Sequence, residues 1–186
     1  RPCPGIDTVT YGGKIYNTVL IGDQCWLKEN LDVGTMIPGI LEQTNNGVIE
    51  KYCYDNSPAN CNTYGGLYQW NEAMQYVTTE GTQGICPEGW HIPKLTEYQV
   101  LISEVNSDGN ALKAIGQGSG SGAGTNTSGF SALLGGQRYP DYFGGLDLYT
   151  QIWSSSRIAS VYMYYLDIEG PNSNIYLLYK DHYYIP

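Results

Sequence analysis

Few side chains in this sequence could carry covalent chemistry. The 186-residue chain has two histidines, and it contains neither a GxSxG nor an HExxH pattern. Nucleophilic catalysis needs a nucleophile beside a base and a group that orients the base, and no such set is marked by spacing. The 18 aspartates and glutamates include no pair that spacing singles out as an acid and a base. We therefore expect a protein that is not an enzyme.

The five cysteines indicate disulfides, and none of them lies in a CxxC pair. Cys53 and Cys61 enclose the turn-rich stretch YDNSPAN, whereas Cys3 precedes the first strand signal and Cys25 follows the next one. We predict the pairs Cys3–Cys25 and Cys53–Cys61, which leaves Cys86 over and indicates an oxidising compartment. The alternative is that three or more of these thiols are free and buried.

Metal ligands are less clearly marked. His91 and His182 lack the spacing to the cysteines that a zinc site needs, so we expect no zinc. Oxygen ligands for a structural calcium ion could come from two loop clusters, which are Asp55, Asn56 and Asn60, and Asn106, Asp108 and Asn110. We favour the interpretation that these side chains form Asx turns. No cofactor is expected, with structural calcium as the alternative.

Charge and hydropathy exclude several partners. Charged residues make up 15% of the sequence, and the net charge is −9 at pH 7. Nucleic acids and anionic membranes are polyanions, so neither is an expected partner. No apolar run approaches the roughly 20 residues that a membrane-spanning helix needs, and no membrane span is expected. The lack of a basic, apolar leader favours a mature or trimmed chain.

The chain length predicts a single domain over residues 1–186, built from the following elements. An N-terminal arm, residues 1–10, leads into two or three short strands. Gly12 and Gly13 are a hairpin signal, because glycine supplies the positive φ that a tight turn needs. A long, turn-rich loop is expected at residues 35–64.

Two helices are predicted in the centre of the chain. Apolar residues at spacings of three and four predict one helix over 66–77. A second helix is predicted at 96–105, where Thr96 and Gln99 resemble a capping box. A short third helix is predicted over 110–115.

The C-terminal part of the chain is predicted to be β. Residues 116–129 are rich in glycine and form a long loop without the lysine of a phosphate-binding loop. Strand-like runs follow, and the last strands are predicted at 161–168 and 174–180. Central helices followed by an antiparallel β region make an α+β domain.

Large apolar side chains in these elements predict the core. All four tryptophans are expected to be core residues: Trp26, Trp70, Trp90 and Trp153. Leu101, Ile102, Trp90 and Trp153 should be among the most buried side chains. We also expect Arg138 and Glu88 to form a buried ion pair, and the serines of IWSSS to hydrogen-bond backbone groups.

Tyrosine is concentrated at the C-terminal end. Ten of the 18 tyrosines lie in residues 137–186, at positions 139, 142, 149, 162, 164, 165, 176, 179, 183 and 184. Tyrosine gives a large, rigid contact area and one hydroxyl at low entropic cost. Since residues two apart share a strand face, the candidate recognition face is Asp141, Tyr142, Tyr162, Tyr164 and one of Tyr176 and Tyr179. The alternative is a tyrosine-rich sheet that is merely solvated or covered by loops.

Five sequence islands carry a family resemblance. They are IYNTVLIGDQCWLKENL (15–31), TYGGLYQWNEAM (63–74), GICPEGWHIPKLTEY (84–98), SGFSALLGGQRY (128–139) and IWSSS (152–156). In this order they resemble the Fibrobacter succinogenes major paralogous domain, a bacterial extracellular module, from about residue 6 to the end. The string CPEGWHIP followed by a helix is the most specific part.

The resemblance implies a C-type-lectin-like fold, a group that includes formylglycine-generating enzyme. It implies two helices packed on a twisted, mostly antiparallel sheet, with long loops and disulfides. The late cysteine pair of that enzyme is missing here, and the calcium-binding sugar motifs of such lectins lack their carboxylate in this chain. Relatives often end in a GFSVRC-like strand, so the partner of Cys86 is expected beyond Pro186.

The leading functional hypothesis is a secreted or cell-surface, non-catalytic recognition or adhesion module. Its partner would be a polysaccharide or protein bound through the tyrosine-rich C-terminal sheet. The alternative is a structural subunit that self-assembles in an extracellular filament, pilus or surface layer.

Overall fold

A computed structural model describes residues 1–181 as a mixed α and β fold. The strands are β1 (Thr8–Tyr11), β2 (Lys14–Ile21), β3 (Gln24–Leu27), β4 (Thr35–Met36), β5 (Glu50–Lys51), β6 (Gly135–Arg138), β7 (Phe143–Leu146), β8 (Tyr149–Arg157), β9 (Tyr162–Glu169) and β10 (Ile175–Asp181). The helices are α1 (Pro58–Tyr64), α2 (Trp70–Ala73), α3 (Leu95–Glu104) and α4 (Gly109–Leu112), with 3-10 turns at η1 (Tyr54–Asn56) and η2 (Gly120–Gly122).

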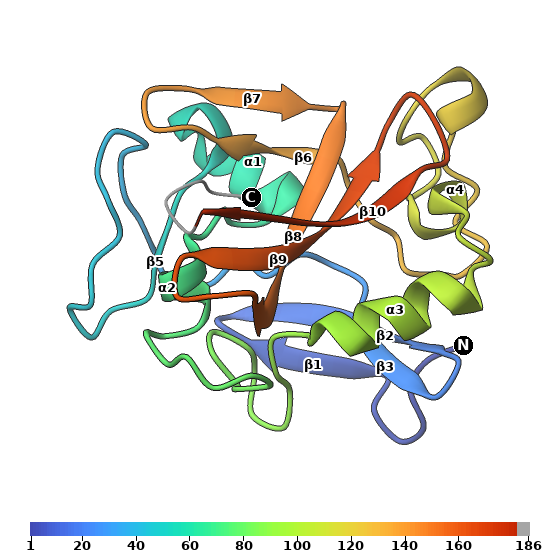
Figure 1. Ribbon diagram of the computed structural model, residues 1–186, viewed down its shortest axis with the longest axis horizontal. Coiled ribbons are helices and arrows are strands. Elements are labelled where there is room, and N and C mark those ends of the chain that lie inside the picture. Colours follow the sequence, from blue (N-terminus) through green and yellow to red (C-terminus); the bar gives the residue numbers. More distant parts are fainter. Residues whose placement is uncertain (182–186) are drawn as a thin grey trace.

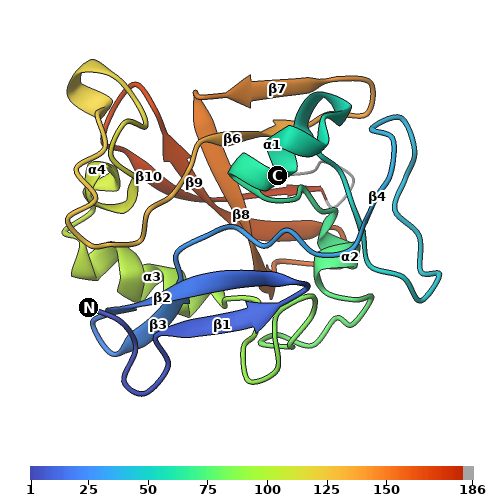
Figure 2. The ribbon, with the colours of Figure 1, turned by 180° about the vertical axis from the view of Figure 1, so that it is seen from behind.

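Two larger sheets organise the molecule. The first is the antiparallel sheet β1-β2-β3, and the second has the order β10-β9-β8-β6-β7. The second sheet is antiparallel except where β6 runs parallel to β8. Strands β4 and β5 form a short parallel pair. The β1-β2-β3 sheet lies on one side of the second sheet with α3 beside both (Figure 1), whereas α1 lies near β6 and β7 at the far end (Figure 2).

Two apolar cores lie against opposite faces of β9. Leu166 and Ile168 join the core that α3 shares with the first sheet. Met163 and Tyr165 join the other core, which contains Trp153 and the loops around α2. This division follows from strand geometry, because successive side chains point to opposite faces of a sheet.

Strand β8 contains an irregularity between Trp153 and Arg157. Trp153 pairs with Tyr165 and Arg157 pairs with Met163, so three residues of β8 stand opposite one residue of β9. The three are the serines of IWSSS, and this bulge turns their polar groups out of the strand ladder. They are all buried.

The bulged serines hydrogen-bond the chain that leads into α3. The Ser155 N–H and the Ser154 hydroxyl donate to the Pro93 carbonyl, at 2.8 and 2.9 Å. The Leu95 N–H donates to Ser156 Oγ at 2.8 Å, at the first residue of α3. The expected role of these serines in satisfying backbone groups is therefore confirmed.

Two buried tryptophans complete the attachment of β8. Trp70 Nε1 donates to the Ser154 carbonyl at 2.8 Å, and Trp153 Nε1 donates to the Tyr68 carbonyl at 2.9 Å. The Tyr98 hydroxyl on α3 donates to the Trp153 carbonyl at 3.0 Å. A buried N–H or C=O needs such a partner, so these bonds fix α2 and α3 relative to β8.

Both expected disulfides are present. Cys3–Cys25 ties the segment before β1 to β3, with the two Cα atoms 5.6 Å apart. Cys53–Cys61 joins the residue before η1 to α1 across 5.0 Å. Among residues 1–181, Cys86 is the free cysteine, and it is buried.

The predicted helix over 66–77 is wrong in extent. Only Trp70–Ala73 is helical. Leu67 forms an antiparallel bridge with Tyr52, exchanging two backbone hydrogen bonds of 2.9 Å, so the chain before α2 is extended. Gln75 and Tyr76 have positive φ values and end the helix. The apolar residues do recur at helical spacing, but the pairing of Leu67 with Tyr52 makes the backbone before α2 extended.

The other helices also differ from prediction at their ends. α3 begins at Leu95, and the Glu97 carboxylate accepts the Lys94 N–H at 2.7 Å, so the expected capping box at Thr96 is wrong. α4 is one turn, Gly109–Leu112, with an N-cap from Asp108. The loop expected at 35–64 contains β4, β5, η1 and α1, and β1 begins inside the expected arm. The picture of two dominant helices is corrected, since only α3, with ten residues, is long.

Burial follows the prediction for two of four side chains. Leu101 and Trp153 are buried, whereas Ile102 and Trp90 are only partly buried. Arg138 is buried but pairs with Glu42 at 3.0 Å, and Glu88 is exposed. The Arg138 guanidinium also lies 4.7 Å from the centre of the Tyr52 ring. The expected Arg138–Glu88 pair is therefore wrong.

Phenylalanine substitutions test how much the tryptophan hydrogen bonds contribute to stability. Replacing Trp70 with Phe leaves the buried Ser154 carbonyl without its donor, and should lower the free energy of unfolding by about 2–4 kcal/mol. Replacing Trp90 with Phe should cost less than about 1 kcal/mol, because Trp90 Nε1 makes no hydrogen bond within residues 1–181. Urea unfolding of both variants checks this, and equal losses would contradict the role given to Trp70.

Candidate functional site

Three of the six candidate residues come together on one face. Tyr162 and Tyr164 lie on β9, and Tyr179 lies opposite Tyr164 on β10. The Tyr179 ring meets the other two edge to face, with centroids 5.8 Å and 6.2 Å away. Tyr162 and Tyr179 are 45% and 57% exposed, and Tyr164 is partly buried. We call these three residues the tyrosine cluster.

The other three candidates lie elsewhere. Tyr176 pairs with Asp167, so strand alternation places it on the opposite face from Tyr179. Asp141 and Tyr142 lie in the exposed turn between β6 and β7, where Tyr142 stacks on Tyr139 at 4.4 Å. No contact joins this turn to the tyrosine cluster among the described residues. The six candidate residues therefore do not form one face. Three form the tyrosine cluster, two lie in the β6–β7 turn, and Tyr176 lies on the opposite face of the sheet.

The reverse side of β9 and β10 carries an unusual lysine. Lys180 Nζ donates to Gln151 Oε1 at 2.7 Å and to Gln137 Oε1 at 3.0 Å. It also lies 4.7 Å from the ring centre of Tyr165 and 5.4 Å from that of Trp153. Burial lowers the pKa of the Lys180 ammonium to about 7, and the Asp167 carboxylate opposes this only in part.

Burial also raises the pKa of the Asp167 carboxyl. Within the described residues, Asp167 Oδ1 is buried and has no hydrogen-bond partner. Lysine and aspartate thus share an aromatic-walled, polar environment on this face. A desolvated lysine can change its charge near neutral pH, but no nucleophile and base pair accompanies it.

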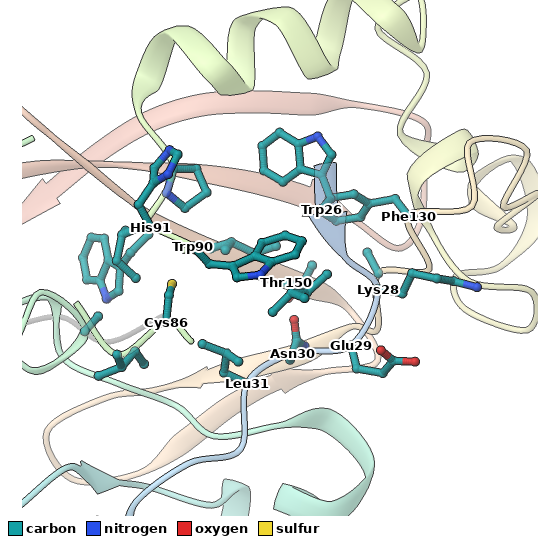
Figure 3. A pocket seen from close by; sticks show the side chains of 18 of the residues that line it. Trp26, Lys28, Glu29, Asn30, Leu31, Cys86, Trp90, His91, Phe130 and Thr150 are labelled. Carbon is teal, nitrogen blue, oxygen red and sulfur yellow. The ribbon is translucent and has the colours of Figure 1, made fainter. Parts of the chain in front are cut away.

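A cavity of about 520 Å³ lies elsewhere, between the segment that contains β3, the loop before α3, and β8. Figure 3 shows the Trp90 indole projecting into the middle of this cavity. Its walls are mainly apolar and include Trp26, Phe130, Leu31 and Ile152. We call this space the Trp90 cleft.

The loop before α3 positions Trp90. The Trp90 N–H closes a turn on the Pro87 carbonyl at 3.0 Å, and the Ile92 N–H donates to the Thr82 carbonyl at 3.0 Å. His91 points outward and contacts both Glu97 carboxylate oxygens at 2.9 Å. His91 is therefore paired at the rim, as a structural residue.

Polar groups face the cleft from its other side. Asn30 Nδ2 donates to the Tyr64 carbonyl at 2.8 Å, and its amide oxygen points into the cavity in Figure 3. Thr150 is buried and lines the same space. The Cys86 thiol also lines it, and burial raises the pKa of that thiol to about 12. Such a thiol is protonated at neutral pH and is a poor nucleophile.

Among residues 1–181, no three His, Cys, Asp or Glu side chains come together as a ligand set. Two of the possible calcium ligands accept backbone hydrogen bonds, Asp108 as the N-cap of α4 and Asn56 from a distant loop. Asp108 Oδ1 accepts the Asn110 N–H at 2.9 Å, and Asn56 Oδ1 accepts the Gly39 N–H at 2.6 Å. His182 lies outside the described residues.

These features define a disulfide-bonded α and β domain with exposed aromatic surfaces and an aromatic-walled cleft. The sequence model of one family, the Fibrobacter succinogenes major domain, matches residues 19–185. The chain belongs to this family. No curated protein sequence matches the chain significantly, and neither does any solved structure. In the part of the chain that the structure describes, no helix has both the length and the apolar character to cross a membrane.

The Trp90 cleft is not among the sites that the sequence predicts. Trp90 was expected in the core because its neighbours are apolar. The available signal was the pair of prolines, Pro87 and Pro93, which enclose Trp90 and His91 in a loop before the helix. Loops on a rigid scaffold often carry binding residues. The distant partners Asn30 and Thr150 had no sequence signal.

The lowered pKa of Lys180 predicts that the stability of the fold depends on pH. Its folded pKa, about 7, is below the ordinary lysine value, so between these values the unfolded chain binds more protons. Stability should therefore rise from pH 7 to about pH 9. Replacing Lys180 with Met should reduce this rise, while Lys113, whose pKa is also lowered by burial, keeps part of it.

Urea unfolding at the two pH values, for the wild type and for Lys180→Met, gives the measurement. A rise of the same size in both proteins would contradict the assignment to Lys180.

Proposed function

We propose that this protein is a secreted or cell-surface, non-catalytic recognition module that binds a polysaccharide or protein. The tyrosine cluster on β9 and β10 is the observation that carries the proposal. Two large side chains there are about half exposed, and all three tyrosines sit on a paired strand backbone. Rigid tyrosines contribute contact area with little loss of conformational entropy on binding.

The location rests on the disulfides. Cys3–Cys25 and Cys53–Cys61 suit an oxidising environment, such as the outside of a cell. The proposed fold class is C-type-lectin-like, which the antiparallel main sheet, the long loops and the helix α3 support.

The tyrosine cluster can be tested by substitution. The double variant Tyr162→Ala with Tyr164→Ala should remain folded and lose about 2 kcal/mol or more of binding free energy, because truncated aromatic anchors typically cost that much. Binding is measured on an array of neutral and acidic glycans and on immobilised extracellular matrix proteins. Tyr176→Ala is the matched control, since Tyr176 is 40% exposed on the opposite face.

Unchanged binding of the double variant would place the recognition face elsewhere. Unfolding of the double variant would show that these tyrosines are core residues. Either result removes the tyrosine cluster from the proposal.

The second candidate function is a self-assembling structural subunit, and the edge strand β10 favours it. Among the described residues β10 pairs only with β9, so it is an edge strand of this sheet. Its sequence is IYLLYKD, and Tyr176 and Leu178 are each 40% exposed. Proteins protect such edges with outward lysines, but Lys180 is turned inward onto Gln137 and Gln151.

An antiparallel pair of β10 strands centred on Leu178 would be self-complementary. Tyr179 of one copy would face Leu177 of the other, and Leu178 would face its own copy. We expect concentration-dependent association in light scattering, and its loss in Leu178→Lys. Val100→Lys is the control, because Val100 is a similarly exposed apolar residue, 44%, on α3. A wild type that stays monomeric at all concentrations would contradict this candidate.

A further inference from the structure

Among the described residues, Trp90 has neither a hydrogen-bond partner for its indole N–H nor a ring contact, whereas each of the other three tryptophans has one or both. Trp70 and Trp153 donate their indole N–H to carbonyl groups. Trp26 packs against Tyr98 and Phe130, at 5.7 Å from each ring. Trp90 makes no such contact within residues 1–181 and is only partly buried. Trp90 packs against the edge of the second apolar core and stays partly exposed, so part of the indole is available for stacking.

Groups that could hydrogen-bond a ligand surround this surface. The indole edge of Trp90 that carries Nε1 is turned toward Asn30 in Figure 3. Asn30 offers an acceptor oxygen, because its amide nitrogen is used by Tyr64. Thr150 offers a hydroxyl that can donate and accept, and no protein group bonds it among the described residues. The cleft therefore combines a donor, an acceptor and a hydroxyl.

Such a combination is complementary to hydroxyl groups. A hydroxyl accepts from an N–H and donates to a carbonyl oxygen. A ligand with only apolar atoms would leave the Trp90 N–H and the Asn30 oxygen without partners, which costs free energy in a desolvated site. A ligand with both an apolar ring face and peripheral hydroxyls satisfies every group.

The charges around the cleft favour a neutral ligand. The charged lining residues are Asp23, Lys28, Glu29 and Glu97. Glu29 is occupied by Asn17, through bonds of 2.7 Å to its N–H and side-chain amide, and Glu97 is occupied by His91. Lys28 and Glu29 extend away from Trp90 and Thr150 in Figure 3, so neutral groups border the middle of the cleft.

We propose that the Trp90 cleft binds one end or one ring segment of a neutral saccharide, with a pyranose ring stacked on Trp90. The apolar C–H face of the ring would contact the indole, and its hydroxyls would reach Asn30 and Thr150. The cavity, about 520 Å³, is within the size range of small-molecule sites. This site is separate from the tyrosine cluster, and it does not depend on that cluster being a recognition face.

The test uses neutral disaccharides as probes, namely cellobiose, maltose, xylobiose and diacetylchitobiose. Glucuronic acid tests for charge and indole tests for a purely apolar ligand. Binding is measured by calorimetry and by saturation-transfer NMR. At least one neutral disaccharide should bind the wild type, and Trp90→Ala and Asn30→Leu should each weaken that binding by about tenfold or more.

Controls separate this site from folding and from the tyrosine cluster. Trp90→Phe keeps a ring in the cleft, and should retain more binding than Trp90→Ala at unchanged secondary structure. The variant with both Tyr162→Ala and Tyr164→Ala should bind the disaccharide like the wild type. A lost glycan-array signal in that variant then concerns only the tyrosine cluster.

Three results would overturn the proposal. They are no binding of any neutral disaccharide, tighter binding of indole or glucuronic acid than of every disaccharide, and equal disaccharide binding by Trp90→Ala and the wild type.

Discussion

The bulge of β8 is the constraint on which the rest of the structure depends. It places Ser154–Ser156 outside the regular ladder, and their groups hydrogen-bond the chain at Pro93 and Leu95. The same segment accepts the indole N–H of Trp70 and the hydroxyl of Tyr98. Because each of these groups is buried, losing one partner leaves another unsatisfied, and the elements are fixed together.

The loop before α3 is positioned by this attachment, and the Trp90 cleft is a consequence. Pro93 and Leu95 are held by the serines, which fixes the end of the loop that carries Trp90. Trp90 then faces Thr150, near the start of the same strand that holds its loop. One strand thus supplies both the anchor of the loop and a wall of the cleft.

β9 divides the tyrosines between two environments. Residues of one parity, including Tyr162 and Tyr164, extend the face whose inner part is the α3 core. Residues of the other parity, including Tyr165 and Asp167, form the face that holds Lys180. The tyrosines of β9 therefore lie in different environments: Tyr162 is exposed on one face, whereas Tyr165 lies beside Lys180 on the other.

The sequence by itself determined the disulfide pairs, the strands β9 and β10, the helix α3 and the family. These depend on local spacing, alternation and motif order, which the chain carries without reference to distant residues. Only the tertiary structure decided that residues 66–69 are extended, because Leu67 pairs with Tyr52, and that Arg138 pairs with Glu42 and not Glu88. It also decided which tyrosines meet, and it brought Asn30, Trp90 and Thr150 to one cleft. Contacts between residues that are distant in the sequence leave no periodic signal, since they follow from how the sheets and loops pack.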